Sequence, residues 1–211
     1  MEHSDVIEKI EKSGVIVILR QECEAFVDEY LPALIESGLA SIEVSLTADR
    51  YAGCFAKLVK RYGDQLVIGT GTIFCKEQAQ RALDDGAQFL ISPHFDEDLT
   101  TFILGKSVPY LAGCLTPTEV ADATRAGVDA VKIFPASLGG PRYIAALRAP
   151  FPKARFVPTG GVAPADAAAY WQAGAWAVAI GSELGVLMRQ PDAITKLKQL
   201  FSRGQNDQAA L

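Results

Sequence analysis

The chain has 211 residues, of which 49% are hydrophobic and 21% are charged, so it has enough apolar residues for one sizeable core. Its net charge of −5 disfavours nucleic acid or an anionic membrane as a partner, although a local site can still bind an anionic small molecule. No uncharged apolar run reaches the roughly 18 residues of a membrane-spanning helix. The polar, acidic N-terminus lacks the pattern of a signal peptide.

The predicted elements alternate between strands and helices along the whole chain. Strands are expected at 15–19, 41–45, 66–69, 88–91, 108–112, 129–135, 156–158 and 176–180. Helices are expected at 5–12, 24–37, 49–62, 76–86, 96–105, 117–126, 141–149, 164–173 and 191–202, with Ser4 capping the first and a loose tail at 204–211. Eight such units without a linker predict a single domain, residues 1–211. We expect a closed (β/α)8 TIM barrel with a short N-terminal helix, and not an open doubly wound sheet.

Glycines mark several of the predicted helix ends. Gly38, Gly86, Gly127 and Gly174 each follow a predicted helix and precede a strand. Glycine at this position is typical of the junction from a helix to a strand, because it adopts a positive φ without steric cost.

The four cysteines are scattered and contain no C-x-x-C pair, and the chain has only two histidines. This spacing gives no indication of a disulfide framework or of a Cys/His zinc site. We therefore expect the reducing environment of the cytoplasm.

Lys132 is the one lysine of ten that falls inside a predicted barrel strand. Alternation along that strand places it on the same face as Ala130 and Phe134, opposite Val131 and Ile133. Burial would lower the pKa of its amine, and a neutral amine is the nucleophile that Schiff-base chemistry needs. The alternative is a lysine at a strand end that reaches solvent or pairs with a carboxylate.

Glu43 is the acidic counterpart of this lysine. Ile42 and Val44 are expected to face the helices, so Glu43 shares the inward face with Ser41 and Ser45. Burying a carboxylate without a partner is costly, which favours a functional role over a structural one. An inward lysine and an inward glutamate would supply a nucleophile and a general acid/base.

Anion-binding residues are expected at the mouth of the barrel. Active sites of this fold lie at the C-terminal strand ends, and phosphate is commonly bound after the seventh and eighth strands. Thr159, Gly160 and Gly161 follow the seventh strand, while Gly181 and Ser182 follow the eighth. Glycines let backbone N–H groups approach an anion closely, so two such loops together predict a phosphate site, although each alone is typical of an ordinary turn.

Arg20 comes at the mouth end of the first strand. Its guanidinium could bind a substrate carboxylate through two hydrogen bonds. The alternative is a surface ion pair.

Five segments, in this order and spacing, carry a family resemblance. They are GTGTIF at 69–74, ISPHFD at 91–96, LAGCLTPTE at 111–119, VKIFPAS at 131–137 and FVPTGGV at 156–162. Together they closely resemble the class I 2-keto-3-deoxy-6-phosphogluconate (KDPG) aldolases, with their 4-hydroxy-2-oxoglutarate (KHG) and phosphogalactonate relatives. The resemblance implies that Lys132 forms the Schiff base and that Glu43 is the acid/base.

The same resemblance implies the substrate and its contacts. Thr72, Pro93 and Phe134 would surround the pyruvyl moiety, and the two glycine loops would bind the phosphate. A 2-keto-3-deoxy-6-phospho sugar acid would be cleaved reversibly to pyruvate and glyceraldehyde 3-phosphate, with no metal or cofactor. The family is commonly trimeric, so a homotrimer is expected; Tyr143, Trp171 and Trp176 would suit either a subunit contact or the core.

The chain departs from the family pattern at the mouth. Thr47 stands where the gluconate-type enzymes have an arginine, with Arg50 close by. Arg20 resembles the strand-one arginine of the phosphogalactonate-type branch, and we expect it to bind the carboxylate instead. The frequent PG before the TP motif is Ala112-Gly113 here, and the frequent PAE after the lysine strand ends in Ser137. These differences leave open which epimer is the substrate.

Three alternatives remain at this stage. The chain could be a KHG aldolase, or a phosphate-binding barrel synthase or isomerase similar to thiamine-phosphate synthase, which would share both glycine loops. It could also be a non-catalytic barrel that binds a phosphorylated metabolite and forms no imine.

Overall fold

The computed structural model describes residues 1–20, 23–48 and 50–207. Eight parallel strands form one sheet in the order β7-β6-β5-β4-β3-β2-β1-β8. They are β1 (Val15–Leu19), β2 (Ser41–Ser45), β3 (Val67–Gly71), β4 (Leu90–Ile91), β5 (Tyr110–Cys114), β6 (Ala130–Ile133), β7 (Phe156–Pro158) and β8 (Val178–Ile180). A parallel bridge between Thr159 and Ala179 joins the two ends of this order, so the sheet nearly closes into a barrel. The predicted (β/α)8 fold class is confirmed.

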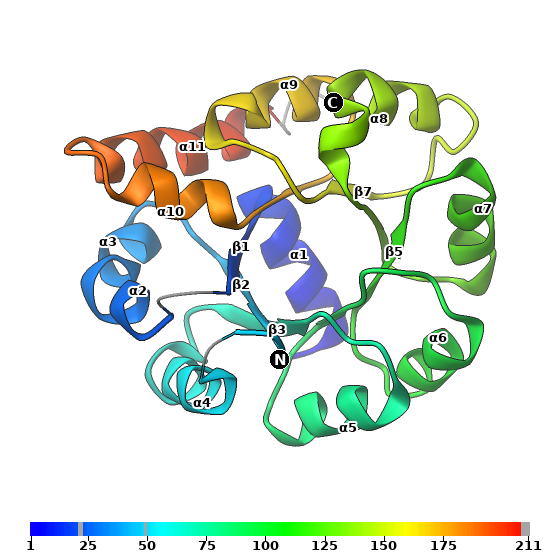
Figure 1. Ribbon diagram of the computed structural model, residues 1–211, viewed down its shortest axis with the longest axis horizontal. Coiled ribbons are helices and arrows are strands. Elements are labelled where there is room, and N and C mark those ends of the chain that lie inside the picture. Colours follow the sequence, from blue (N-terminus) through cyan, green and yellow to red (C-terminus); the bar gives the residue numbers. More distant parts are fainter. Residues whose placement is uncertain (21–22, 49, 208–211) are drawn as a thin grey trace.

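Helices surround the strands, and one further helix lies over the centre of the barrel (Figure 1). The central helix is α1 (His3–Ser13). The surrounding ones are α2 (Cys23–Glu29), α3 (Leu31–Glu36), α4 (Tyr51–Tyr62), α5 (Lys76–Asp84), α6 (Glu97–Leu104), α7 (Pro117–Ala126), α8 (Gly140–Arg148), α9 (Ala167–Gln172), α10 (Ser182–Met188) and α11 (Ala193–Asp207). Two short 3₁₀ turns, η1 (Ala136–Leu138) and η2 (Pro164–Asp166), precede α8 and α9.

The barrel interior and the layer beneath the helices are two separate apolar clusters. The interior cluster contains Val6, Ile10, Ile16, Ile18, Val67, Phe89, Ile91, Leu111, Ala130, Val157, Ala177 and Ala179. Val6 and Ile10 come from α1, which turns into the start of β1 at Gly14, where φ is 63°. Because α1 leads into the N-terminal end of β1, it covers the bottom of the barrel. The mouth at the C-terminal strand ends stays open for a site.

Two predictions about the N-terminal half are wrong. The cap of α1 is Glu2 and not Ser4, because Glu2 and Asp5 form a reciprocal capping box. The helix expected at 24–37 is two helices, α2 and α3, which meet at Tyr30. Pro32 lies in the first turn of α3, where its missing N–H and its ring are tolerated, whereas the same ring would break a continuous helix.

The C-terminal part also differs from the prediction. The predicted elements did not include α10, a short helix that follows β8 directly and contains Gly185. The final helix runs through Gly204 to Asp207, so the expected loose tail is helical over 204–207, while 208–211 lie outside the described residues. A glycine inside a helix costs only about 1 kcal/mol, which is too little to end one by itself.

The predicted helix-ending glycines are confirmed, since Gly38, Gly86, Gly127 and Gly174 all have positive φ, from 89° to 103°. Trp171 belongs to the core, being 1% exposed, and its indole N–H donates to the backbone oxygen of Gly14. No helix in the described part of the chain combines the length and apolar composition needed to cross a membrane.

One cysteine differs from expectation. Cys54, buried on α4, is disulfide-bonded, whereas Cys75 and Cys114 are free thiols. Spacing along the sequence did not indicate this bond.

Candidate active site

Lys132 points from β6 into the barrel and is only 4% exposed. Val131 and Ile133 pack in the layer beneath the helices, whereas Ala130 packs inside the barrel, as strand alternation predicted. Gly113 of β5 lies beside Lys132 in the sheet register. The position that a Gly113 side chain would take is filled by the backbone of Pro93, and Val157 of β7 is the register partner of Lys132 on the other side.

Glu43 points inward from β2 and is 1% exposed. Gly71 of β3 makes room for it, because a Cβ at Gly71 would lie 1.6 Å from Glu43 Oε1. Among the described residues, Glu43 Oε2 is buried without a hydrogen-bond partner. A buried carboxylate oxygen without a partner is available to a ligand or a water.

Burial and mutual charge shift both groups. Desolvation raises the pKa of the Glu43 carboxyl, and the positive charges of Lys132 and Arg20 offset part of that increase. Desolvation lowers the pKa of the Lys132 amine; the Glu43 charge opposes this shift, and the Arg20 charge adds to it. Both shifts favour the uncharged forms, which are an amine able to attack a carbonyl and a carboxylic acid able to donate a proton.

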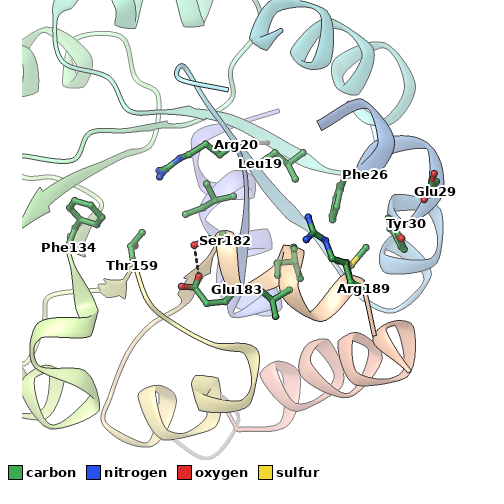
Figure 2. Close-up of a pocket in the computed structure, with 17 residues that line it drawn as sticks. Leu19, Arg20, Phe26, Glu29, Tyr30, Phe134, Thr159, Ser182, Glu183 and Arg189 are labelled. Atoms are coloured by element: carbon green, nitrogen blue, oxygen red, sulfur yellow. Dashed lines mark hydrogen bonds between the residues drawn. The ribbon is translucent and has the colours of Figure 1, made fainter. Parts of the chain in front are cut away.

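Arg20 and Phe134 lie at the mouth. Arg20 is exposed directly after β1, and Figure 2 shows its guanidinium pointing toward the side of the mouth that holds Phe134 and Thr159. Phe134 is 36% exposed, and its ring centroid lies 5.1 Å from Lys132 Nζ. The Arg20 guanidinium and the Phe134 ring therefore flank the entrance to the buried amine of Lys132.

Thr72 and Pro93 lie on the loops after β3 and β4. Thr72 has a φ of 66°, in the left-handed region, which is unusual for a β-branched residue. The backbone of Pro93 packs so closely on Gly113 that a Cβ there would lie 2.1 Å from the Pro93 carbonyl carbon. Both residues are half-buried at the open end of the barrel.

A cavity of about 520 Å³ lies at the mouth, beside β1 and α10. Figure 2 shows Phe134 and Thr159 at one end of it and Glu29 and Tyr30 at the other. Six predicted site residues line this cavity, namely Arg20, Phe134, Thr159, Gly160, Gly181 and Ser182. The remaining five, Lys132, Glu43, Thr72, Pro93 and Gly161, lie outside its lining.

The two glycine loops come together because β7 and β8 are neighbours. Gly160 and Gly161 both have positive φ, at 85° and 74°, so the backbone turns tightly after Thr159. The Thr159 hydroxyl donates to Val157 O at 3.0 Å, which ties the start of the loop to its own strand. In the described part of the chain, no group of three or more His, Cys, Asp and Glu side chains is arranged to hold a metal ion.

Comparison with known proteins decides the family. The family model for KDPG and KHG aldolases matches residues 6–199. The chain belongs to this family. It is 33% identical over 174 residues to the 2-dehydro-3-deoxy-6-phosphogalactonate aldolase of Escherichia coli K12, covering 82% of this chain and 85% of that one.

Two further relatives agree with this assignment. The aldolase is 37% identical over 161 residues to the 2-dehydro-3-deoxy-phosphogluconate aldolase of Treponema pallidum, covering 74% of this chain and 75% of the relative. A solved structure described as native KDPGal superposes with a TM-score of 0.79 at 29% identity, covering 93% of this chain and 96% of that chain. The relatives thus include both the galactonate and the gluconate types.

Sequence reasoning assigned no role to two side chains of the aldolase that contact predicted site residues. Ser45 was expected to face inward, and its hydroxyl contacts Thr72. Glu183, on the unpredicted helix α10, accepts a hydrogen bond from the Ser182 hydroxyl at 3.1 Å. The acidic residue after Ser182 was visible in the sequence, but its position depends on α10.

Proposed function

We propose that this aldolase cleaves a 2-keto-3-deoxy-6-phospho sugar acid reversibly to pyruvate and glyceraldehyde 3-phosphate through a Schiff base on Lys132. The observation that carries the proposal is the buried amine of Lys132, whose pKa is lowered by burial. The buried carboxyl of Glu43 faces the same barrel interior, and the charge of each group affects the pKa of the other. Membership of the KDPG and KHG aldolase family supports the same chemistry.

The first half of the reaction forms the imine. The neutral amine of Lys132 attacks the C2 ketone of the substrate and gives a carbinolamine. Glu43 donates its proton to the C2 oxygen, which leaves as water and produces an iminium. The raised pKa of Glu43 supports this step, because burial favours the protonated carboxylic acid.

The second half breaks the carbon–carbon bond. The Glu43 carboxylate, through a water, accepts the proton of the C4 hydroxyl while the C3–C4 bond breaks and the aldehyde forms. The electron pair of that bond moves to the iminium and gives an enamine. Protonation at C3 and hydrolysis then release pyruvate and restore the free amine of Lys132.

The remaining site residues bind the two ends of the substrate. Arg20 would bind the carboxylate, because its charge is close enough to affect both Glu43 and Lys132. Thr72, Pro93 and Phe134 would surround the pyruvyl carbons. The phosphate would occupy the cavity beside the loops of Thr159, Gly160, Gly161, Gly181 and Ser182, whose backbone N–H groups suit an anion.

One observation favours a second candidate, a KHG aldolase acting on a substrate without phosphate. The Glu183 carboxylate lies 3.1 Å from Ser182 Oγ, in the loop assigned to phosphate. A phosphate there would have to displace Glu183 or stay beside a like charge. A comparison of kcat/KM on substrates with and without a phosphate distinguishes the two candidates.

A cleavage assay coupled to pyruvate release tests the proposal on the gluconate and galactonate phospho-epimers and on 4-hydroxy-2-oxoglutarate. We expect one phospho-epimer to give the highest kcat/KM and Lys132→Ala to be inactive on all three. A higher kcat/KM for 4-hydroxy-2-oxoglutarate would replace the proposed substrate with the second candidate. Release of pyruvate by Lys132→Ala at the wild-type rate would refute the mechanism.

We also propose that the domain spans residues 1–211 and that the aldolase is a cytoplasmic homotrimer, as its resemblance to the family implies. The burial of Trp171 leaves Tyr143 and Trp176 as candidates for a subunit contact. The disulfide bond of Cys54 runs against the cytoplasmic part of this proposal, since disulfides are rare in reducing compartments. Light scattering of the purified protein measures the subunit number, and a monomer would refute this part.

A further inference from the structure

Three hydroxyl groups meet where β2 and β3 end at the mouth. Ser45, the last residue of β2, is fully buried and faces inward like Glu43. Its Oγ lies 2.7 Å from Thr72 Oγ1 and 2.8 Å from Thr47 Oγ1. It also accepts the backbone N–H of Thr47 at 3.3 Å. The Ser45 hydroxyl therefore links the loop after β2 to the loop after β3.

The hydrogen bonds at Ser45 constrain one another. A hydroxyl has one proton to donate and two lone pairs to accept with. Because the Thr47 N–H uses one lone pair, Ser45 donates to one threonine hydroxyl and accepts from the other. When Ser45 accepts from Thr47 and donates to Thr72, the proton of the Thr72 hydroxyl stays available to a ligand.

Thr72 has a backbone conformation that needs support. Among the described residues, the non-glycine residues with positive φ are Arg50, Thr72 and Ser107. Such a conformation persists only where surrounding contacts hold it, and it occurs frequently at functional sites. Its loop is tied at both ends, since Leu46 N–H donates to Gly71 O at 2.9 Å and Ile73 N–H to Ile91 O at 3.2 Å. The contact with Ser45 adds a side-chain restraint between these two ties.

We propose that Ser45 is a positioning residue for the aldol reaction. It holds the left-handed backbone of Thr72 and directs the Thr72 hydroxyl toward the keto acid bound at Lys132. The inference rests on the proposed function, because it requires a pyruvyl group beside Thr72. Thr47 completes the hydroxyl chain at the position where gluconate-type relatives have an arginine.

A double-mutant cycle tests whether Ser45 acts through Thr72. In the wild-type background, Ser45→Ala should raise the KM for the cleaved substrate about tenfold, as expected for one lost hydrogen bond, with a smaller change in kcat. Thr72→Gly adopts a positive φ without strain and has no hydroxyl to orient. In that background Ser45→Ala should change KM by less than about twofold.

Two further variants serve as controls. Ser45→Thr keeps the hydroxyl and should stay within about threefold of the wild-type KM. Ser41→Ala is matched to Ser45→Ala, because Ser41 is also a fully buried, inward serine of β2. Its hydroxyl donates to Val15 O at 2.8 Å and not to Thr72, so this variant should keep the wild-type KM.

Borohydride trapping with pyruvate separates a failure of this inference from a failure of the proposed function. A wild-type protein that forms no adduct refutes the function itself. Half-maximal trapping should need about ten times more pyruvate in Ser45→Ala than in wild type. The role of Ser45 is overturned if Ser45→Ala needs the same pyruvate concentration as wild type for half-maximal trapping. It is also overturned if Ser45→Ala changes KM equally in the wild-type and the Thr72→Gly backgrounds. If Ser45→Ala does not fold, Ser45→Cys replaces it with the same expected results, because a thiol is a weak hydrogen-bonding group.

Discussion

At the scale of single residues, the site depends on two buried groups, one basic and one acidic. Lys132 is 4% exposed and Glu43 1% exposed, and burial shifts the pKa of each toward its neutral form. Arg20 acts on both from the mouth, lowering the pKa of the lysine and that of the glutamate. Changing either Glu43 or Arg20 should therefore alter the pH range in which the amine is reactive.

The pH dependence of imine formation checks this coupling. The rate should rise with pH as Lys132 loses its proton, with a midpoint below the ordinary pKa of 10.5. Glu43→Gln removes a charge that raises the lysine pKa, so its midpoint should move to lower pH. Arg20→Gln removes a charge that lowers the lysine pKa, so its midpoint should move to higher pH. The rates of borohydride trapping with pyruvate between about pH 5 and pH 10 measure the midpoints of both variants.

The control for these variants is Arg125→Gln, an exposed arginine that pairs with Asp122 on the outer surface. Its midpoint should equal that of the wild type. Shifts of Glu43→Gln and Arg20→Gln in the same direction would contradict the coupling. In the cleavage assay, Glu43→Gln should also lower kcat by about 10² to 10⁴, the usual contribution of a general acid/base.

At the scale of elements, α1 forms the floor beneath the site. Val6 and Ile10 of this helix pack in the same cluster as Ile16 and Ala130 inside the barrel. The helix therefore closes the bottom of the interior, while the strand ends above it carry the reactive groups. Removing its packing should weaken the whole barrel and not the helix alone.

Truncation of Ile10 measures this contribution. Ile10 is fully buried, so Ile10→Ala should lower the free energy of unfolding by about 2–5 kcal/mol. Ile194 on α11 is 39% exposed, and Ile194→Ala should change the free energy of unfolding by no more than about 0.5 kcal/mol. Urea denaturation followed by circular dichroism compares the two. Equal losses would show that α1 contributes no more than a surface helix.

The sequence predicted the elements that have strong periodic patterns. Strand alternation placed Lys132 and Glu43 inside the barrel, and the rule for strand ends placed the two glycine loops at the mouth. It did not predict α10, because a short helix that includes Gly185 has a weak pattern. It also did not predict the contact between Ser45 and Thr72, because that contact depends on the left-handed backbone of a loop residue. Local backbone geometry of this kind leaves little trace in residue types.

At the scale of the whole molecule, closure of the barrel brings together loops that are far apart in the sequence. The bridge between Thr159 and Ala179 places the two predicted anion loops side by side. The same closure buries Glu43 and Lys132 in one interior. Taking both groups out of water opposes folding, so the site should reduce the stability of the protein.

Replacing both buried groups should therefore stabilise the fold. The raised pKa of Glu43 means that its stabilising effect at low pH is lost as pH rises from 4.5 through its folded value. The lowered pKa of Lys132 means that its effect is present at high pH and is lost as pH falls from 10.5 through its folded value. At pH 7, Glu43→Gln combined with Lys132→Met should raise the free energy of unfolding by about 1–4 kcal/mol. A double variant whose free energy of unfolding in urea is equal to or lower than that of the wild type would contradict this prediction.

The most direct test of the central claim is mass spectrometry after incubation with pyruvate and borohydride. Reduction of the imine should add one stable pyruvate-derived mass per chain, on the peptide that contains Lys132. The same mass should be absent from Lys132→Ala. An adduct that persists in Lys132→Ala, or a wild-type protein that gains no mass, would contradict the assignment of Lys132 as the Schiff-base lysine.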